Sequence, residues 1–486
     1  MAIPTPLWLE RWRPNSILHR CKRLLRFSPK RTDKLQKSHS ITRILYTKPK
    51  LLSYKFLPAG LPDWLRASVL VISLSLFGKA LGFLREIEAA RLFGIGMEVD
   101  AFVAASTLLF FICRMASDSL LINTPVLLEG YQNNGAQVPW GEMFRSLLFV
   151  SIVLTLLAWL LLPPIVPVLF GGLSQDARQL TVQLVVVMLP LVIGWTMVGA
   201  LGGVHNAQHR YGGYHAALIV TNGVILVTLW LFAQRIGIKS LAYGWVVGIG
   251  LGVLVVVYPL RHQWRQITMW NGWVSQWLAL RSIVWGSGGL SLWFLLNQVP
   301  VWIERYYAAQ LPTGSLAALG YAQRLFQLPL EMVTAVVISV WVTQVVSMPA
   351  DRVAQQTFRL MGRLAAVTFP ISLLLALFAR PVISLVYARG AFDAYAVTMT
   401  AGPFAMYALG WGFHTLSAVL VRTFQARGLV RYPLLAVVVD ILLTFFLNIF
   451  SFRQGWGSTG IAAINSVVAG VRVVVLSVCA HFLEKF

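Results

Sequence analysis

Long apolar segments recur along most of this chain and constrain its fold more than any other feature. Leu147–Val168 and Leu241–Leu260 are two examples. A helix needs roughly 20 apolar residues to cross a bilayer core about 30 Å thick, and each of these segments is about that long. Only 12% of the residues are charged, whereas a soluble globular protein has about 25%. The sequence therefore predicts an all-α polytopic membrane protein.

The apolar segments predict twelve membrane-spanning helices after Trp64. They are centred near residues 75, 110, 157, 190, 223, 250, 292, 332, 370, 410, 440 and 470. A weak internal repeat aligns Tyr214–Leu229 with Tyr432–Leu447 at an offset of 218 residues. Because six spans return a chain to its starting side, we expect two parallel six-helix lobes, residues 62–275 and 276–486, around a central cavity.

The first 61 residues form a separate and strongly basic region. Several later loops are also basic, and the positive-inside rule then predicts that both termini lie in the cytoplasm. This distribution accounts for the net charge of +23, so we expect no nucleic-acid partner. Within the tail, Ser16–Phe27 fits either a short helix on the membrane surface or a disordered basic tail held near anionic lipid. An organellar targeting peptide is a third reading, since the tail contains few acidic residues.

Ionisable side chains inside the predicted spans are the strongest pointers to function. A charge in the membrane is costly unless it faces a partner or a wet cavity. Lys79, Arg85, Arg114 and Arg324 lie in such spans. Arginine suits phosphate because its planar fork donates two parallel hydrogen bonds. These four residues predict a cationic cavity that binds an anionic headgroup. The alternative is a structural role, as interhelix ion pairs or as side chains that reach toward a membrane face.

A second group of charged residues is predicted to gate the cavity through ion pairs. The group consists of Asp100, Asp118, Glu304 and Arg305. Within it, Asp118 lies one helical turn beyond Arg114, so the two side chains can pair.

A third group, in the eleventh predicted span, is a candidate site for a coupling ion. Asp440, Thr444 and Asn448 recur at every helical turn, so their oxygens could hold Na⁺ or carry a proton. The alternative is polar packing between helices. We expect no metal or organic cofactor, and no arrangement of a nucleophile with a base indicates an enzyme.

Two stretches of the sequence resemble a known family. Residues 77–102 read FGKALGFLREIEAARLFGIGMEVDAF, and residues 297–330 read NQVPVWIERYYAAQLPTGSLAALGYAQRLFQLPL. Both are similar to the MurJ/MviN family of lipid II flippases, in the MOP exporter superfamily. In the first stretch that family shows a basic residue, LGF-x-R-[DE] and AR-x-FG-x-G. In the second it shows an acid–Arg pair and YA-x-RL. The resemblance extends over most of residues 64–450.

The resemblance implies two lobes, as in MATE transporters, that alternate access to a central cavity. It implies export of lipid II, an undecaprenyl-diphosphate-linked precursor, across the bacterial cytoplasmic membrane for peptidoglycan and cell-wall biogenesis. Membrane lipids and cell-envelope synthesis enzymes are the implied partners, and a Na⁺ or H⁺ gradient or the membrane potential could drive the cycle. Lys79, Arg85, Asp100, Arg114 and Arg324 match positions where the family lines or gates its cavity.

The sequence departs from the family in ways that leave other cargoes open. Lys79 stands where the family commonly has arginine, and the last two spans of the family have no counterpart among the twelve predicted. The alternatives are a flippase for another polyprenyl-linked oligosaccharide, a small-molecule or drug exporter of the same superfamily, and a scaffold that recruits envelope enzymes without transport.

Overall fold

A computed structural model describes residues 63–133, 140–208, 210, 212–261 and 288–480. The basic tail and the lobe boundary predicted between residues 275 and 276 lie outside these ranges. Contacts divide the chain into two units, Met1–Arg66 and Ala67–Phe486. Of the first unit only the start of one helix is described, and everything below concerns the second.

The described residues form sixteen helices and no strand, which confirms the all-α prediction. The helices of the first half are α2 (Asp63–Phe93), α3 (Met97–Asn133), α4 (Trp140–Leu169), α5 (Gln175–Met188), α6 (Pro190–Ala207), α7 (Gly212–Ile236) and α8 (Lys239–Val257). Those of the second half are α10 (Gly288–Leu296), α11 (Val299–Ala308), α12 (Ser315–Ser347), α13 (Ala350–Leu377), α14 (Ala379–Tyr387), α15 (Ala394–Leu409), α16 (Trp411–Ala426), α17 (Arg431–Arg453) and α18 (Gly457–Ala480).

Seven described helices are individually long and apolar enough to cross a membrane, and two bent pairs raise the number to nine. The pairs are α5 with α6, bent by 44°, and α15 with α16, bent by 46°. The first bend adjoins Pro190, which lacks the N–H that would continue the helix. The second lies at Gly410, where an added Cβ would be 2.2 Å from Oγ of Ser466.

All twelve predicted centres fall in a described helix or at one of these two bends. The centres near residues 75, 292 and 332 fall in α2, α10 and α12, which are not among the seven helices. The number of twelve spans therefore stays a prediction.

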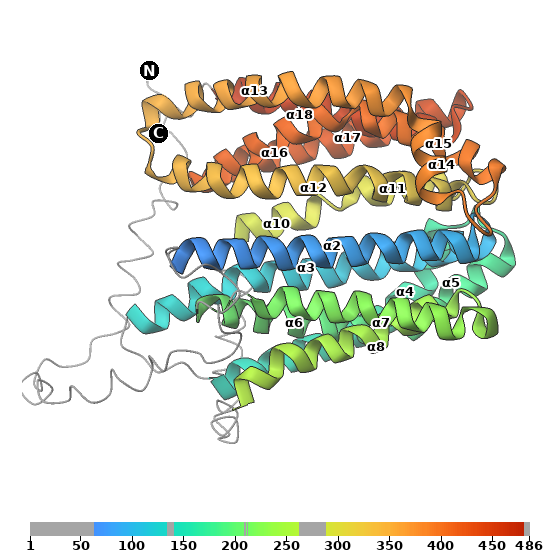
Figure 1. Cartoon of the computed structure of the whole chain (residues 1–486), viewed down its shortest axis with the longest axis horizontal. Coiled ribbons are helices and arrows are strands. Elements are labelled where there is room, and N and C mark those ends of the chain that lie inside the picture. The colour runs from blue at the N-terminus through green and yellow to red at the C-terminus, as the bar shows by residue number, and fades with distance from the viewer. Residues whose placement is uncertain (1–62, 134–139, 209, 211, 262–287, 481–486) are drawn as a thin grey trace, which may run out of the picture. The chain divides into compact units, whose positions relative to one another are not determined.

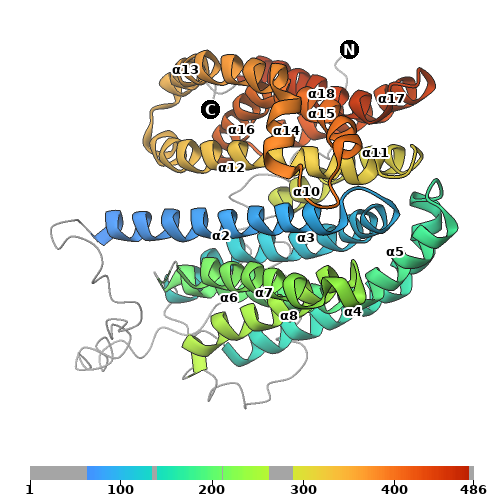
Figure 2. The same ribbon diagram turned by 45° about the vertical axis from the view of Figure 1, so that its right-hand side comes forward.

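Helices α2–α8 gather on one side and α10–α18 on the other (Figures 1 and 2). In the first half α3 packs on α5 and α6, and α7 packs on α8. In the second half α18 packs on α15, α16 and α17. We call the boundary between these two halves the seam. Across the seam α3 contacts α10, α11 and α12, and α2 lies along the seam in both views.

The two halves are joined at one end of the molecule by hydrogen bonds and by close packing of their turns. The backbone N–H of Ala391 donates to the carbonyl of Arg91 at 2.8 Å. The Asp100 carboxylate accepts hydrogen bonds from two N–H groups at the start of α12, Gly314 at 2.6 Å and Ala317 at 2.7 Å. At Gly172 an added Cβ would lie 2.5 Å from the carbonyl oxygen of Ala309. We call the turns that make these contacts, residues 91–100, 170–174, 309–317 and 388–394, the sealed end.

Candidate functional site

A cavity of about 600 Å³ lies between the two halves, lined by residues of α2, α3, α6, α7, α8 and α12. All four cations that the sequence pointed to, Lys79, Arg85, Arg114 and Arg324, line this cavity. Lys79 and Arg85 lie six residues apart and so do not share a helix face, yet the cavity is broad enough for both to border it. The cavity occupies the part of α2 and α12 that lies away from the sealed end.

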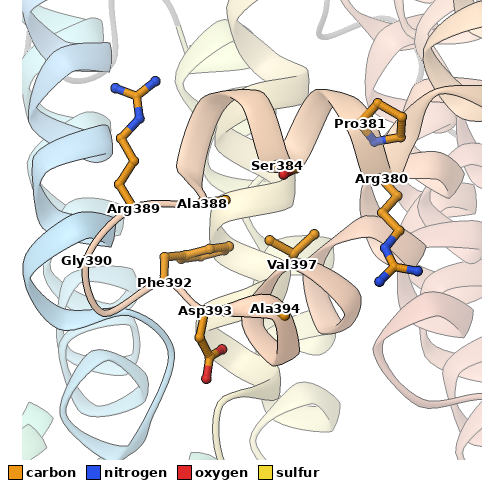
Figure 3. A pocket seen from close by; sticks show the side chains of 10 residues that line it. All are labelled: Arg380, Pro381, Ser384, Ala388, Arg389, Gly390, Phe392, Asp393, Ala394 and Val397. Atoms are coloured by element: carbon orange, nitrogen blue, oxygen red, sulfur yellow. The ribbon is translucent and has the colours of Figure 1, made fainter.

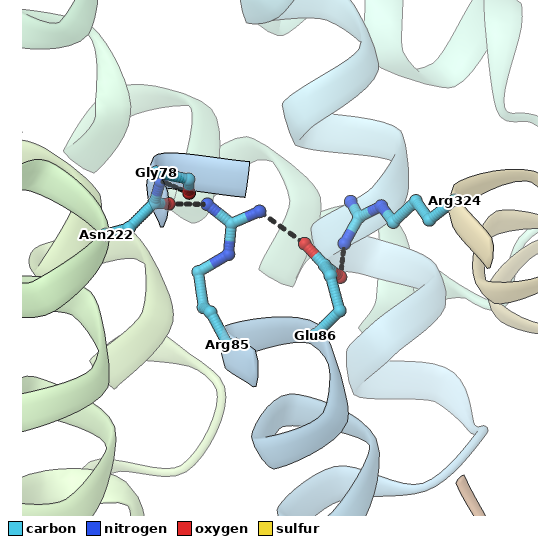
Figure 4. A network of polar contacts seen from close by, with 5 residues as sticks. All are labelled: Gly78, Arg85, Glu86, Asn222 and Arg324. Atoms are coloured by element: carbon cyan, nitrogen blue, oxygen red, sulfur yellow. Dashed lines mark hydrogen bonds and ion pairs between the residues drawn. The ribbon is translucent and has the colours of Figure 1, made fainter. Parts of the chain in front are cut away.

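The Glu86 carboxylate bridges two arginines at the border of the cavity (Figure 4). Arg85 donates to its Oε1 at 2.5 Å, and Arg324 from the second half donates to its Oε2. Only 7% of the Glu86 side chain is exposed, and an unpaired charge so deeply buried would be costly. The two arginines therefore neutralise the buried Glu86 carboxylate, and the bridge joins α2 to α12. Sequence reasoning missed Glu86, although it directly follows Arg85 in the LGF-x-R-E motif.

The guanidinium of Arg85 is held in place by the helices of its own half. It donates to Oδ1 of Asn222 at 2.8 Å, and the Asn222 amide donates in turn to the Gly78 carbonyl at 3.2 Å. On its other side it lies 4.5 Å from the ring centroid of Trp245, at a distance suited to a cation–π contact. These contacts fix the direction of the Arg85 fork toward the cavity. Neither partner was identified from the sequence, because both lie more than a hundred residues away from Arg85.

Two further charge interactions cross the seam at the cavity. Nζ of Lys79 lies 2.7 Å from Oε2 of Glu331, and these side chains are 27% and 48% exposed. A pair so exposed to solvent contributes about 1 kcal/mol or less. Asp118 interacts electrostatically with Arg114 of its own helix and with Arg422 of the second half. Asp118 takes part in none of the ion pairs of the described residues, so its pairing with Arg114 stays a prediction.

The other three residues predicted to gate the cavity form their hydrogen bonds with uncharged groups. Asp100 caps α12 through the two N–H groups described above, so its link between the halves rests on helix capping and not on a cation. Glu304 accepts a hydrogen bond from the amide of Asn465 at 2.7 Å. The neighbouring Arg305 donates to the Gln323 side chain. Their role in gating stays a prediction.

The polar face predicted on α17 is present and buried against α18. Asp440, Thr444 and Asn448 are at most 1% exposed. Nε of Arg472, from α18, donates to Oδ2 of Asp440 at 2.6 Å, and the Asn448 amide donates to the Thr444 carbonyl at 2.7 Å. The Arg472 guanidinium neutralises the Asp440 carboxylate, as polar packing between helices would require. Oδ1 of Asp440 and Oδ1 of Asn448 are buried and have no hydrogen-bond partner among the described residues, so the cation site stays a prediction.

Replacing Arg472 with Gln is expected to lower the stability of the protein by about 2–3 kcal/mol. The substitution leaves the Asp440 carboxylate buried without its cation, and breaking a buried pair costs about 3–5 kcal/mol; the partial exposure of Arg472 reduces the effect. Thermal unfolding in detergent measures the loss. Sodium should stabilise R472Q more than the wild type, because it can replace the lost positive charge beside Asp440. An equal sodium effect in both proteins would contradict the role of Arg472 in neutralising Asp440.

Comparisons with known proteins give one consistent family. The model of the family "Lipid II flippase MurJ" matches residues 89–481. A probable lipid II flippase MurJ of Rhizobium tropici is 26% identical over 437 residues, which cover 84% of this chain and 79% of the relative. One from Thermotoga maritima is 24% identical over 415 residues, covering 84% of each chain.

Two solved structures show the same fold. The structure titled "Lipid II flippase MurJ, inward closed conformation" is similar with a TM-score of 0.74 and 18% identity, covering 85% of this chain and 87% of its own. An inward-facing MATE family transporter of the MOP superfamily gives a TM-score of 0.68 and 15% identity, covering 86% of this chain and 99% of its own. These likenesses confirm a polytopic fold in two halves, as predicted for the superfamily.

Proposed function

Because this chain belongs to the MurJ family of lipid II flippases, and so is a multi-pass protein of the bacterial inner membrane, we propose that it is a transporter of lipid II. Its cargo would be the undecaprenyl-diphosphate-linked precursor of peptidoglycan. The observation that carries the proposal is the convergence of Lys79, Arg85, Arg114 and Arg324 on one cavity between the halves. Four cations around about 600 Å³ suit a diphosphate, whose oxygens accept charge-assisted hydrogen bonds.

The Glu86 bridge gives the diphosphate a way to act on the two halves. Glu86 accepts hydrogen bonds from both Arg85 and Arg324. A diphosphate carries more negative charge than one carboxylate, and it would compete with Glu86 for the Arg324 guanidinium. Displacement of Glu86 would remove a direct link between α2 and α12. Cargo binding would thus weaken the closed arrangement and allow the halves to rock, while the polyprenyl tail stays in lipid.

The loop charges predict which side of the membrane the cavity faces. With both termini in the cytoplasm, the sealed end lies on the outer face, because α2 runs from the N-terminal side to that end. The cavity then faces the cytoplasm, where a diphosphate-linked precursor would enter. The membrane potential, or a Na⁺ or H⁺ gradient, would reset the carrier, and enzymes of cell-envelope synthesis would supply or receive the cargo.

Reconstitution into vesicles tests this function directly. In vesicles, the wild-type chain should move fluorescent lipid II to the opposite leaflet, where a reagent can reach it. The control variant Arg359→Gln, changed at an exposed position of α13, should give the same result. A chain that is correctly inserted but leaves lipid II on its original side would overturn the proposal. Another polyprenyl-diphosphate oligosaccharide, assayed in parallel, addresses the main alternative, since the same cations would bind its diphosphate whatever its sugars.

Replacing Trp245 with Leu is expected to weaken cargo binding by about five- to tenfold. The substitution removes the ring beside the Arg85 guanidinium, and a cation–π contact shielded from water is worth about 1 kcal/mol or more. Titration of lipid II against protein in detergent measures the change. Trp230→Leu is a matched control, because Trp230 is an exposed residue of α7 and does not line the cavity. Equal affinities of W245L and the wild type would show that Arg85 needs no support from this ring.

A further inference from the structure

Tyr387, the last residue of α14, is fully buried, and its hydroxyl forms no hydrogen bond with any described residue. Buried polar groups are nearly always hydrogen-bonded, because an unpaired one has lost its bonds to water without replacement. A hydroxyl in this position is therefore suited to a partner that reaches it in another arrangement of the protein. Tyr387 does not line the central cavity, and the mechanism proposed above does not use it.

Three packed aromatic rings connect Tyr387 with α12 and with the sealed end. The centroid of the Tyr387 ring lies 5.4 Å from that of Tyr321 on α12 and 5.4 Å from that of Phe392. The centroids of Tyr321 and Phe392 are 5.6 Å apart. Figure 3 shows Phe392 in the loop between α14 and α15. We call these three residues the aromatic cluster. All three are buried, and in a close-packed interior a shift of one ring displaces its neighbours.

Arg324 of the Glu86 bridge lies next to the aromatic cluster, three residues beyond Tyr321 on α12. Residues three apart share a helix face, and Tyr321 and Arg324 line the same small pocket at the seam. The positive charge of Arg324 acts electrostatically on Tyr387. Among the described residues Arg324 donates a hydrogen bond only to Glu86, whereas a guanidinium has five N–H donors. Arg324 therefore has donors left for the Tyr387 hydroxyl, whose oxygen can accept one.

The aromatic cluster also adjoins the backbone contacts that close the sealed end. Phe392 directly follows Ala391, whose N–H donates to the Arg91 carbonyl of α2 at 2.8 Å. Gly94 of the first half packs so closely on this loop that an added Cβ would lie 2.3 Å from the Ala391 carbonyl oxygen. A displacement of Phe392 therefore disturbs contacts that hold the two halves together at this end.

We propose that the Tyr387 hydroxyl is a second partner of Arg324 and accepts a hydrogen bond from it once the cargo has displaced Glu86. The inference rests on the proposed function, in which the cargo diphosphate competes with Glu86 for Arg324. Glu86 belongs to the first half and Tyr387 to the second, so the exchange replaces a link across the seam with a link inside one half. It also displaces the Tyr387 ring and, through Phe392, the loop that closes the sealed end. Tyr387 is thus a positioning residue that couples the cavity to the sealed end.

Replacing Tyr387 with Phe tests the inference, because the substitution removes the hydroxyl and keeps the ring. In the vesicle assay described above, the rate of lipid II translocation should fall about tenfold or more, as expected for the loss of one hydrogen bond to a charged group. The midpoint of thermal unfolding in detergent should not fall, because the hydroxyl has no hydrogen bond to lose in the closed arrangement. A residue with a merely structural role would lower both quantities together.

Thr400→Val is the matched control for Tyr387→Phe. Thr400, on α15, is also fully buried, and its hydroxyl also lacks a hydrogen-bond partner among the described residues. It lies outside the aromatic cluster, so Thr400→Val should leave both the translocation rate and the unfolding midpoint close to those of the wild type. Arg324→Ala gives a second check, with enough protein to quantify its residual rate. Once the guanidinium is absent, adding Tyr387→Phe should cause no further loss, whereas independent effects would multiply.

The outcomes distinguish this inference from the proposed function. A slower Tyr387→Phe of undiminished stability, beside an active Thr400→Val, supports the inference. A wild-type rate in Tyr387→Phe, an equal loss of rate in both variants, or a rate that falls together with the unfolding midpoint would overturn it. A further loss when Tyr387→Phe is added to Arg324→Ala would overturn it as well. If the wild-type chain itself left lipid II on its original side, the proposed function would fail and this inference with it.

Discussion

Replacing Arg324 with Ala is expected to lower lipid II translocation by about a hundredfold. Arg324 is the guanidinium that the second half contributes to the Glu86 bridge, and the proposed mechanism transfers it to the cargo diphosphate. Hydrogen bonds to a charged group contribute about 1.5–3 kcal/mol each, and loss of two corresponds to about two orders of magnitude. The vesicle assay described above measures the rate.

Two variants sharpen the interpretation of R324A. Arg324→Lys keeps the charge but loses the planar fork, so it should retain intermediate activity if bidentate contact with phosphate matters. Arg85→Ala removes the other guanidinium on Glu86 and should be about as damaging as R324A. Translocation at the wild-type rate in the Arg85→Ala/Arg324→Ala double variant, at normal insertion, would remove this pair from the mechanism.

Replacing Asp100 with Ala is expected to lower the stability of the protein by about 3 kcal/mol. The carboxylate accepts hydrogen bonds from two backbone N–H groups of the second half, and it is only 2% exposed. Its removal leaves both N–H groups buried without a partner, and each such group costs about 1–3 kcal/mol. The apparent midpoint of thermal unfolding in detergent should fall by about 3 °C.

Asp393 provides a matched control for this second substitution. It also caps a helix at the sealed end, through the N–H of Ala396, but it is exposed and serves a helix of its own half. Asp393→Ala should therefore cost about 1 kcal/mol, as expected for loss of an exposed helix cap. If Asp100→Ala and Asp393→Ala lowered the unfolding midpoint equally, the hydrogen bonds of Asp100 across the seam would stabilise the protein no more than an exposed helix cap does.

The helices and their polar faces could be predicted from the sequence because both depend on local spacing. Apolar length places a span, and every predicted centre coincides with a described helix or bend. Asp440, Thr444 and Asn448 share a face because they recur at each turn, and they are all buried. The convergence of Lys79, Arg85, Arg114 and Arg324 could also be anticipated, because charges within spans collect where they can be solvated or paired.

The partners of these charges could not be predicted, because they are set by packing between distant segments. Glu86 meets Arg324, 238 positions along the chain, and Asp100 meets Ala317, 217 positions along. Asp100 was expected to form an ion pair, since its charge is visible in the sequence, whereas the N–H groups at the start of α12 become its partners only in the fold. Arg472 was overlooked for the same reason: it lies on α18 and Asp440 on α17, so its pairing depends on how these two helices pack.

Depletion rescue tests the central claim most directly. The chain is expressed in a bacterium whose own essential lipid II flippase is depleted, and growth is measured together with the amount of protein in the inner membrane. A lipid II flippase that works through this cavity should restore growth, and the Arg85→Ala/Arg324→Ala variant should not, although equally present. Failure of the wild-type chain at normal expression would contradict lipid II as its cargo, and rescue by the double variant would contradict the site.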